Sequence, residues 1–236
     1  MKTKLAWAIL GFLLLCTFAL TFFKSPEEIK ALLTTVAGDL KPYSVFVHIL
    51  FIVVLVLGFF LNRMQSMLFF LFIAFLSLSA TVVSVVYAII PNIIIFAAFS
   101  VLIVQAFAAK NLNFSFEKDR SVDLMFGIVG LLFGFWYLHW VEDPIWLNAL
   151  FFSPLGAVNC PTMVTICGFL CLSRQPRSLF LETAVGLTTL YFGFFGLFRL
   201  GAYVDIVLIA CALFLLARLT ACMTRDALVR ESALPK

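Results

Sequence analysis

The sequence predicts an all-α integral membrane protein: a polytopic bundle of about eight transmembrane helices, with one broken helix near residues 153–161. Three observations support this fold class. Of the 236 residues, 64% are hydrophobic and only 12% are charged, against about 25% charged in an ordinary soluble domain. The mean hydropathy is +1.15. The charged residues are also separated by long uncharged runs. One soluble core could not bury this much apolar surface, which excludes a soluble enzyme, a disordered chain and a nucleic-acid-binding protein.

The uncharged runs locate the spans. The longest, residues 64–109, has 46 residues. As a helix it would measure about 69 Å, roughly two bilayer cores. Pro91 and Asn92 divide it near the middle, as a turn between two helices would. The predicted spans are 5–23, 43–62, the two halves of 64–109, 124–141, 144–173, 183–198 and 201–217.

Residues 1–23 are expected to form an N-terminal transmembrane anchor. Lys2 and Lys4 would also suit the basic region of a signal peptide. The apolar stretch is longer than the usual 7–15 residues of a signal peptide, and no small-x-small cleavage site follows it. We therefore expect an uncleaved signal anchor. If it is cleaved, seven spans remain.

Residues 24–42 predict a short amphipathic helix at the membrane interface. Ser25 and Glu28 have the spacing of a capping box, and Pro26 occupies the first helical position. Five apolar residues then recur at helical spacing: Ile29, Leu32, Leu33, Val36 and Leu40. The segment is expected to dock on the bundle (residues 43–221), and a substrate lid is the alternative.

The basic residues predict the orientation. If the N-terminus lies inside, the inner segments hold twelve Lys and Arg residues and the outer loops hold four. Both termini are then expected in the cytoplasm, with 222–236 as a cytoplasmic tail. Aromatic residues typical of an interfacial belt gather where the fifth and sixth spans meet the outer surface: Trp136, Tyr137, Trp140 and Trp146.

The sixth span is predicted to be broken. Its 30 residues, 144–173, would form a helix of about 45 Å, half again the hydrocarbon thickness. Pro154, Gly156 and Pro161 lie within it. We expect a half-helix to begin near Pro161, capped by Asn159 or Cys160. Irregular backbone at membrane depth is tolerated only inside protein or beside water, so the break should face the bundle interior.

Asp205 is expected to share this site. It precedes Arg218 by 13 residues, and Cys160 precedes Arg174 by 14. Both therefore lie about 20 Å from the inner boundary. Spans six and eight thus predict one polar site, open to the outside, whose residues are Asn159, Cys160, Pro161, Thr162 and Asp205. The unpaired amides of the half-helix are a candidate partner for the carboxylate.

Two alternatives remain open for these residues. Arg218 could snorkel, which would raise Asp205 to the interface as an ordinary helix N-terminal acid. The segment Asn159 to Thr162 could be a purely structural break. His139, beside Glu142 and Asp143, is a further candidate for binding a cation or relaying protons near Asp205, or it belongs to a solvated loop.

Cysteines suggest a second kind of site. Cys160, Cys167 and Cys171 are spaced i, i+7 and i+11 on one helical face, and Cys211 is at a depth similar to that of Cys167. Cys160, Cys167 and Cys211 are therefore weak candidates for soft-metal binding or thiol redox chemistry. Buried cysteines acting as small apolar residues are the alternative. The chain lacks the nucleotide-binding, zinc-protease and nucleophile-elbow motifs, so no cofactor is predicted.

Small and hydroxyl residues in the spans predict helix packing. Gly130 and Gly134 form a G-x-x-x-G pair that would allow close approach of a neighbouring helix. Ser77, Thr81 and Ser84 form a polar stripe that interhelical hydrogen bonding or a substrate path would explain.

The stretch from Phe152 through Asn159, Cys160 and Pro161 to Thr162 resembles the signature of an uncharacterised bacterial membrane family, the domain of unknown function 6064. Members carry a similar Phe-Gly-Val-x-Pro-Cys-Pro-Thr-Thr segment before a helix, and a late Asp that Asp205 matches. The resemblance extends over about 41–216. This chain has Asn159 where the family has Pro, and Met163 where it has a second Thr. The resemblance implies a fold, a candidate site region and a bacterial inner membrane, but no reaction.

Three functional hypotheses follow. The first is a carrier or channel for a small solute or ion, acting through the polar site at the broken helix. The second is a structural, sensory or accessory subunit, and the third is a membrane thiol redox or metal protein. The lipid bilayer is the expected partner, with a further membrane protein or a second copy of the chain as candidates, and no nucleic acid.

Overall fold

The computed structural model describes residues 21–114, 121–137, 150–174 and 177–232, together with positions 8, 11, 12, 15 and 19. Most of the expected N-terminal anchor therefore lies outside the described residues. The same holds for His139, Glu142 and Asp143 and for the last four residues of the tail.

The described chain is helical almost throughout, which confirms the all-α class. Its helices are α2 (Pro26–Asp39), α3 (Lys41–Phe60), α4 (Gln65–Val86), α5 (Ile90–Ala108), α6 (Ser121–Phe135), α8 (Asn159–Cys171), α9 (Leu179–Phe194) and α10 (Ile206–Ser232). A π-helical turn, Phe195–Leu200, and a 3₁₀ turn, Tyr203–Asp205, connect α9 to α10. Two short strands, β1 (Asn113–Phe114) and β2 (Ser173–Arg174), pair antiparallel, with Asn113 opposite Arg174.

Among the described residues, five helical segments are long and apolar enough to cross a membrane. They are α3, α4, α5, Leu179–Leu200 and Tyr203–Cys222. The expected count of about eight is not confirmed. The fifth expected span is represented by α6, whose 15 residues measure about 22 Å. The sixth is represented by the 13-residue α8. Both are shorter than a hydrocarbon core of about 30 Å.

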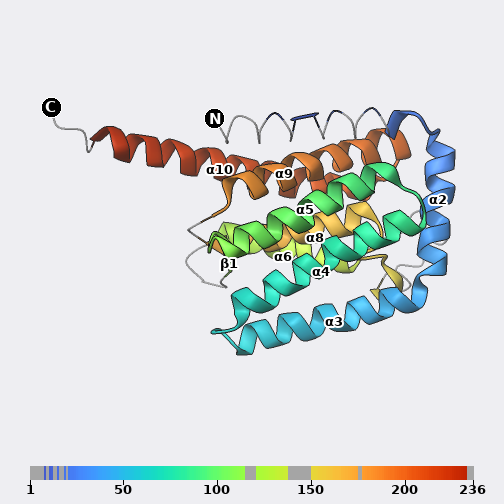
Figure 1. Ribbon diagram of the computed structural model, residues 1–236, viewed down its shortest axis with the longest axis horizontal. Coiled ribbons are helices and arrows are strands. Elements are labelled where there is room, and N and C mark those ends of the chain that lie inside the picture. Colours follow the sequence, from blue (N-terminus) through green and yellow to red (C-terminus); the bar gives the residue numbers. More distant parts are fainter. Residues whose placement is uncertain are drawn as a thin grey trace.

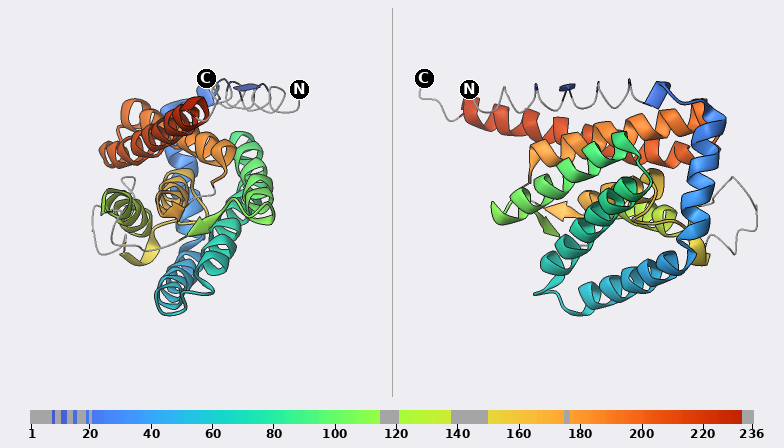
Figure 2. Two further views of the ribbon diagram at one scale, coloured as in Figure 1. Left: turned by 90° about the vertical axis from the view of Figure 1, so that its left-hand side faces the viewer. Right: turned by 45° about the vertical axis from the view of Figure 1, so that its right-hand side comes forward.

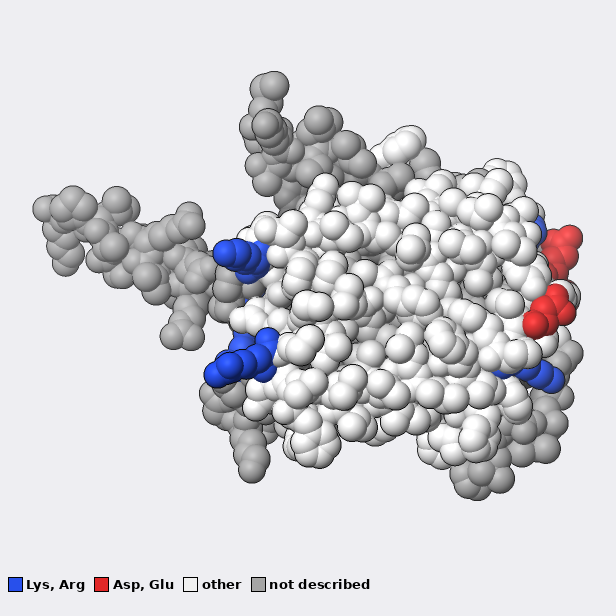
Figure 3. All heavy atoms as spheres, turned by 60° about the horizontal axis from the view of Figure 1, so that its bottom comes forward, with Lys and Arg blue, Asp and Glu red and all other residues white. Residues whose placement is uncertain are grey.

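The long helices run side by side, and α2 crosses one end of the bundle (Figure 1). The capping box predicted for α2 is present, because Ser25 and Glu28 each accept the other's backbone N–H. On the face shown in Figure 3, charged side chains gather at the two ends and an uncharged band lies between them. Large apolar side chains such as Phe59, Phe60 and Val86 are exposed. This surface is the one expected of a protein that faces lipid.

The short helix α8 lies at the centre of the bundle (Figure 2, left). Every residue from Cys160 to Cys171 is buried. The aromatic ring of Phe169 packs against the ring of Phe51 in α3, with 6.2 Å between ring centroids. It also packs against the rings of Phe69 and Phe72 in α4, with centroid distances of 5.0 and 5.8 Å. These ring contacts hold α3 and α4 against α8.

Glycines bring α6 into backbone contact with α8. A Cβ on Gly130 would lie 2.9 Å from the Cα of Gly168, and a Cβ on Gly134 would lie 2.9 Å from the carbonyl oxygen of Pro161. Only hydrogen fits at these positions. The glycine spacing in α6 thus serves packing, as small residues do in membrane helix pairs.

Replacing Gly130 by Ala should lower the free energy of unfolding by about 1–3 kcal/mol, because the added methyl group meets backbone atoms that cannot move independently. Thermal unfolding of the purified protein in detergent micelles measures this change. The matched control is Gly38→Ala in α2, where a Cβ would meet nothing within 4 Å. Equal unfolding temperatures for the two variants would contradict the packing role of Gly130.

Candidate functional site

The predicted break is present and lies inside the protein. Residues 153–158 are non-helical, and all six are buried. Gly156 has φ +75°, a conformation that other residues rarely adopt, and this reverses the chain before α8. Ser153 donates to the carbonyl oxygen of Gly134 at 3.1 Å, and Ser79 of α4 donates to that of Gly156 at 2.7 Å. Neighbouring helices therefore satisfy the irregular backbone, as membrane depth requires.

The start of the half-helix differs from the prediction. Helix α8 begins at Asn159, and Val158 is its N-cap with no side-chain capping bond. Neither Asn159 nor Cys160 caps it. Pro161 instead occupies the first turn, where its missing N–H costs nothing. The hydroxyl of Thr162 ties the turn together, because it accepts from the N–H of Gly156 at 2.9 Å and donates to the carbonyl oxygen of Val158 at 2.6 Å.

Asp205 is fully buried at the start of α10. The hydroxyl of Tyr137 donates to its Oδ1 at 2.7 Å, and the thiol of Cys160 donates to its Oδ2 at 3.5 Å. The residues at equal predicted depth, Cys160 and Asp205, therefore lie in direct contact. Both donors are neutral side chains, whereas the sequence indicated the amides of α8 as the partner. We call Asp205, Cys160 and Tyr137 the Asp205 cluster.

Gly196 provides the space for this carboxylate. A Cβ on Gly196 would lie 1.6 Å from Oδ2 of Asp205, so no side chain fits there. The π-helical turn is closed by Gly201 at φ +70°, and the N–H of Ala202 bonds to the carbonyl oxygen of Gly196 at 2.9 Å. This local geometry brings Asp205 back against the turn that precedes it.

Tyr137 was predicted to lie in the interfacial belt, and that prediction is wrong. Its side chain is 3% exposed and contacts the buried acid. Gly127, Gly130 and Gly134 lie on the face of α6 that meets α8, and Tyr137 follows two residues after the helix ends at Phe135. Because Tyr137 lies beyond the end of α6, helical spacing did not predict its inward position.

At the opposite end of α8, Arg218 turns into the protein. Its guanidinium donates to the carbonyl oxygens of Cys171 at 2.5 Å and Leu170 at 2.7 Å. It also bonds Glu182 at 3.1 Å and lies 3.5 Å from Asp123. Its side chain is 9% exposed, so the arrangement is not a snorkelling one. We call Arg218, Glu182 and Asp123 the Arg218 network.

The metal-candidate cysteines are not gathered in one place. Cys167 lies near Cys171 and Cys211. Cys160 lies about two helical turns before Cys167 in α8, where it contacts Asp205. Within the described ranges, no group of three His, Cys, Asp or Glu residues could hold a metal ion. Cys211 instead donates weakly to the carbonyl oxygen of Phe126 at 3.9 Å.

His48 of α3 was not predicted as a site residue. Its Nε2 lies 2.8 Å from the carbonyl oxygen of Phe135 and its Nδ1 lies 3.1 Å from that of Phe151. Both contacts are donating bonds when both nitrogens carry a proton. The imidazole thereby joins the end of α6 to the segment before the break. An ionisable side chain inside the otherwise uncharged run 43–62 was the signal that marked it.

The polar stripe of α4 serves packing in part. Ser77 donates to the carbonyl oxygen of Phe96 in α5 at 2.9 Å, which is an interhelical bond. Thr81 and Ser84 instead donate to carbonyl oxygens of their own helix at 2.9 and 2.6 Å.

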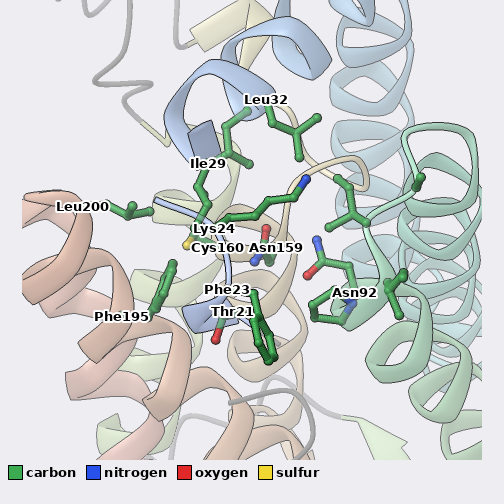
Figure 4. Close-up of a pocket in the computed structure, with 15 residues that line it drawn as sticks. Thr21, Phe23, Lys24, Ile29, Leu32, Asn92, Asn159, Cys160, Phe195 and Leu200 are labelled. Atoms are coloured by element: carbon green, nitrogen blue, oxygen red, sulfur yellow. The ribbon is translucent and has the colours of Figure 1, made fainter. Parts of the chain in front are cut away.

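A cavity of about 280 Å³ lies between α2 and the first turn of α8. Its wall comes from Thr21, Phe23 and Lys24, from α2, from the turn between α4 and α5 with the first turn of α5, and from the π-helical turn. Apolar side chains form most of the lining, and its polar members include Lys24, Asn92, Asn159 and Cys160 (Figure 4). Cys160 lines the cavity while its thiol contacts Asp205, so this residue connects the cavity to the Asp205 cluster.

Comparisons with known proteins found no matching family model, no similar curated protein and no similar solved structure.

A small methanethiosulfonate reagent should modify Cys160 faster than Cys167. Cys160 lines the cavity, whereas Cys167 is fully buried in the centre of the bundle. Peptide mass spectrometry of the labelled protein distinguishes the cysteines, and Cys160→Ser is the control for the assignment. Faster modification of Cys167 would show that the cavity does not provide the access.

Proposed function

We propose that the protein is a membrane carrier for a small solute or ion, in which Asp205 binds the transported or coupled proton or cation. The main support is the buried carboxylate of Asp205, whose two described partners, Tyr137 and Cys160, are both uncharged. An ionised carboxylate in a low-dielectric interior is costly without a positive partner. A proton or a small cation relieves that cost.

The broken helix supports the same proposal. Carriers commonly place their binding site where a discontinuous helix exposes backbone polar groups within the bundle. Here the break at 153–158 directly precedes α8, whose second residue, Cys160, contacts Asp205. A purely structural subunit has no need for an acid at this depth, because apolar packing alone would be more stable.

The proposal includes an orientation. The excess of Lys and Arg in one set of loops favours both termini in the cytoplasm. The resemblance to a bacterial membrane family favours the bacterial inner membrane as the compartment. In that orientation, α2 and the cavity beneath it face the periplasm. The Arg218 network then lies at the cytoplasmic end.

Ion flux into liposomes tests the role of Asp205. The purified protein is reconstituted with an internal pH-sensitive dye, and a potassium diffusion potential, negative inside, is imposed with valinomycin. Wild-type protein should acidify the lumen faster than protein-free liposomes do. Asp205→Asn should reduce the rate to the protein-free level, because an amide cannot bind the proton. Asp205→Glu should retain part of the rate.

Asp39→Asn is the matched control, since Asp39 lies at the same end of the bundle, is exposed and does not contact the Asp205 cluster. A sodium-sensitive dye in a parallel experiment distinguishes sodium from protons. The proposal fails if Asp205→Asn keeps the wild-type flux. It also fails if wild-type protein conducts neither cation above the protein-free level.

A further inference from the structure

We infer that the cavity beneath α2 binds a small amphipathic monocarboxylate, with its carboxylate among Lys24, Asn92 and Asn159 and its apolar body against α2 and the π-helical turn. This inference rests on the proposed function and deepens it by naming the class of solute. Four observations support it: a buried asparagine whose amide has no described partner, a cation with no described partner, a helix start without a side-chain cap and an apolar wall.

Asn92 is the most informative residue of the cavity. Its side chain is only 4% exposed, and it points into the cavity (Figure 4). Its backbone N–H already bonds the carbonyl oxygen of Ile89 at 3.0 Å, but its carboxamide has no hydrogen-bond partner within the described chain. The carboxamide of this buried residue opens onto the cavity, where its hydrogen-bonding groups are available to a ligand. A ligand with hydrogen-bonding oxygens would satisfy it.

Lys24 supplies the charge. Its side chain extends across the cavity towards the space that Asn92 and Asn159 also face (Figure 4). Arg199 fixes the backbone at this point by donating to the carbonyl oxygen of Lys24 at 2.7 Å. No described carboxylate pairs with the ammonium of Lys24. One unpaired cation beside two amides suits a ligand with a single negative charge.

The start of α8 adds to the positive potential. Asn159 and Cys160 form its first turn and line the cavity, and the helix has no side-chain cap. The N–H groups of a first turn have no intrahelical acceptors, so they carry partial positive charge that favours an anion.

The remaining wall determines the rest of the ligand. Ile29, Leu32 and Leu33 of α2, together with Phe195 and Leu200 of the π-helical turn, form apolar parts of the cavity wall. An apolar wall with a few convergent polar groups is the usual composition of a small-molecule site. A fully polar anion would lose hydration against this apolar wall without gaining hydrogen bonds, which is unfavourable. An alkyl group would bury apolar surface there, which is favourable. The combination favours a carboxylate with an alkyl body.

Binding of radiolabelled octanoate to the full-length protein in lipid nanodiscs tests the inference. Unlabelled octanoate should displace the label, whereas octylamine and 1-octanol, which share the alkyl chain, should compete at least about tenfold more weakly. A tenfold difference corresponds to the loss of one charge-assisted hydrogen bond. Equal competition by the three compounds would overturn the inference, since it would mean that only the alkyl chain is recognised.

Two substitutions locate the carboxylate. Lys24→Gln should weaken octanoate binding about tenfold or more, whereas Lys30→Gln, which alters a lysine of α2 that does not line the cavity, should leave it unchanged. Asn92→Asp keeps the shape of the side chain and adds a negative charge. It should reverse the preference from octanoate to octylamine. Unchanged octanoate binding in both Lys24→Gln and Asn92→Asp would overturn the inference.

The variant Asp205→Asn separates this inference from the proposed function. Because Asp205 does not line the cavity, this variant should bind octanoate with wild-type affinity while its ion flux is lost. Wild-type protein that conducts ions but does not bind octanoate would overturn the inference and leave the role of Asp205 intact. Octanoate binding without any Asp205-dependent flux would support the cavity and overturn the carrier mechanism.

Discussion

The structure depends on the burial of α8, a short helix whose two ends both stop inside the bundle. Each end of a helix leaves backbone groups without intrahelical partners, and a membrane interior has no water to bond them. Segments at the start of α10 and within it contact both ends of α8, and the contact at the C-terminal end is made to backbone carbonyl groups. Asp205 at the start of α10 accepts the thiol of Cys160, and Arg218, 13 residues later, donates to the carbonyl oxygens of Leu170 and Cys171. The two helices are therefore held in one register by polar contacts at both ends.

Close packing around α8 follows from the same constraint. A central helix contacts neighbours on all sides, so large side chains cannot occupy every face. The glycines of α6 allow backbone approach on one side, and Phe169 meets the rings of α3 and α4 on another. These contacts also fix the position of the break before α8. The Asp205 cluster is consequently built on rigid elements, which suits a site that must bind a small ion selectively.

The two ends of α8 differ in chemistry. At the Arg218 end, the cation forms ion pairs with Glu182 and Asp123, and Ser173 donates to Glu182 at 2.8 Å. At the other end, the donors to the acid among the described residues are both uncharged, and the cavity is lined by one of them, Cys160. Removing one member of a buried ion network is costly, so the Arg218 end is expected to remain closed. The proposed binding of ions and carboxylates therefore concerns the Asp205 end.

By itself, the sequence determined the all-α class, the capping box at Ser25, the break near residue 153 and the equal depth of Cys160 and Asp205. These features depend on local composition and on the constant rise of a helix, so counting residues predicts them. The tertiary structure alone decided that Tyr137 turns inward, that Gly196 makes room for Asp205, that His48 bridges two carbonyl groups and that Asn92 points unpaired into the cavity. The contacts of Tyr137 with Asp205 and of His48 with Phe135 join residues far apart in the chain, and the position of Asn92 depends on how α5 packs against the other elements. The formation of these contacts depends on which helix faces meet, which the periodicity of any single helix does not specify.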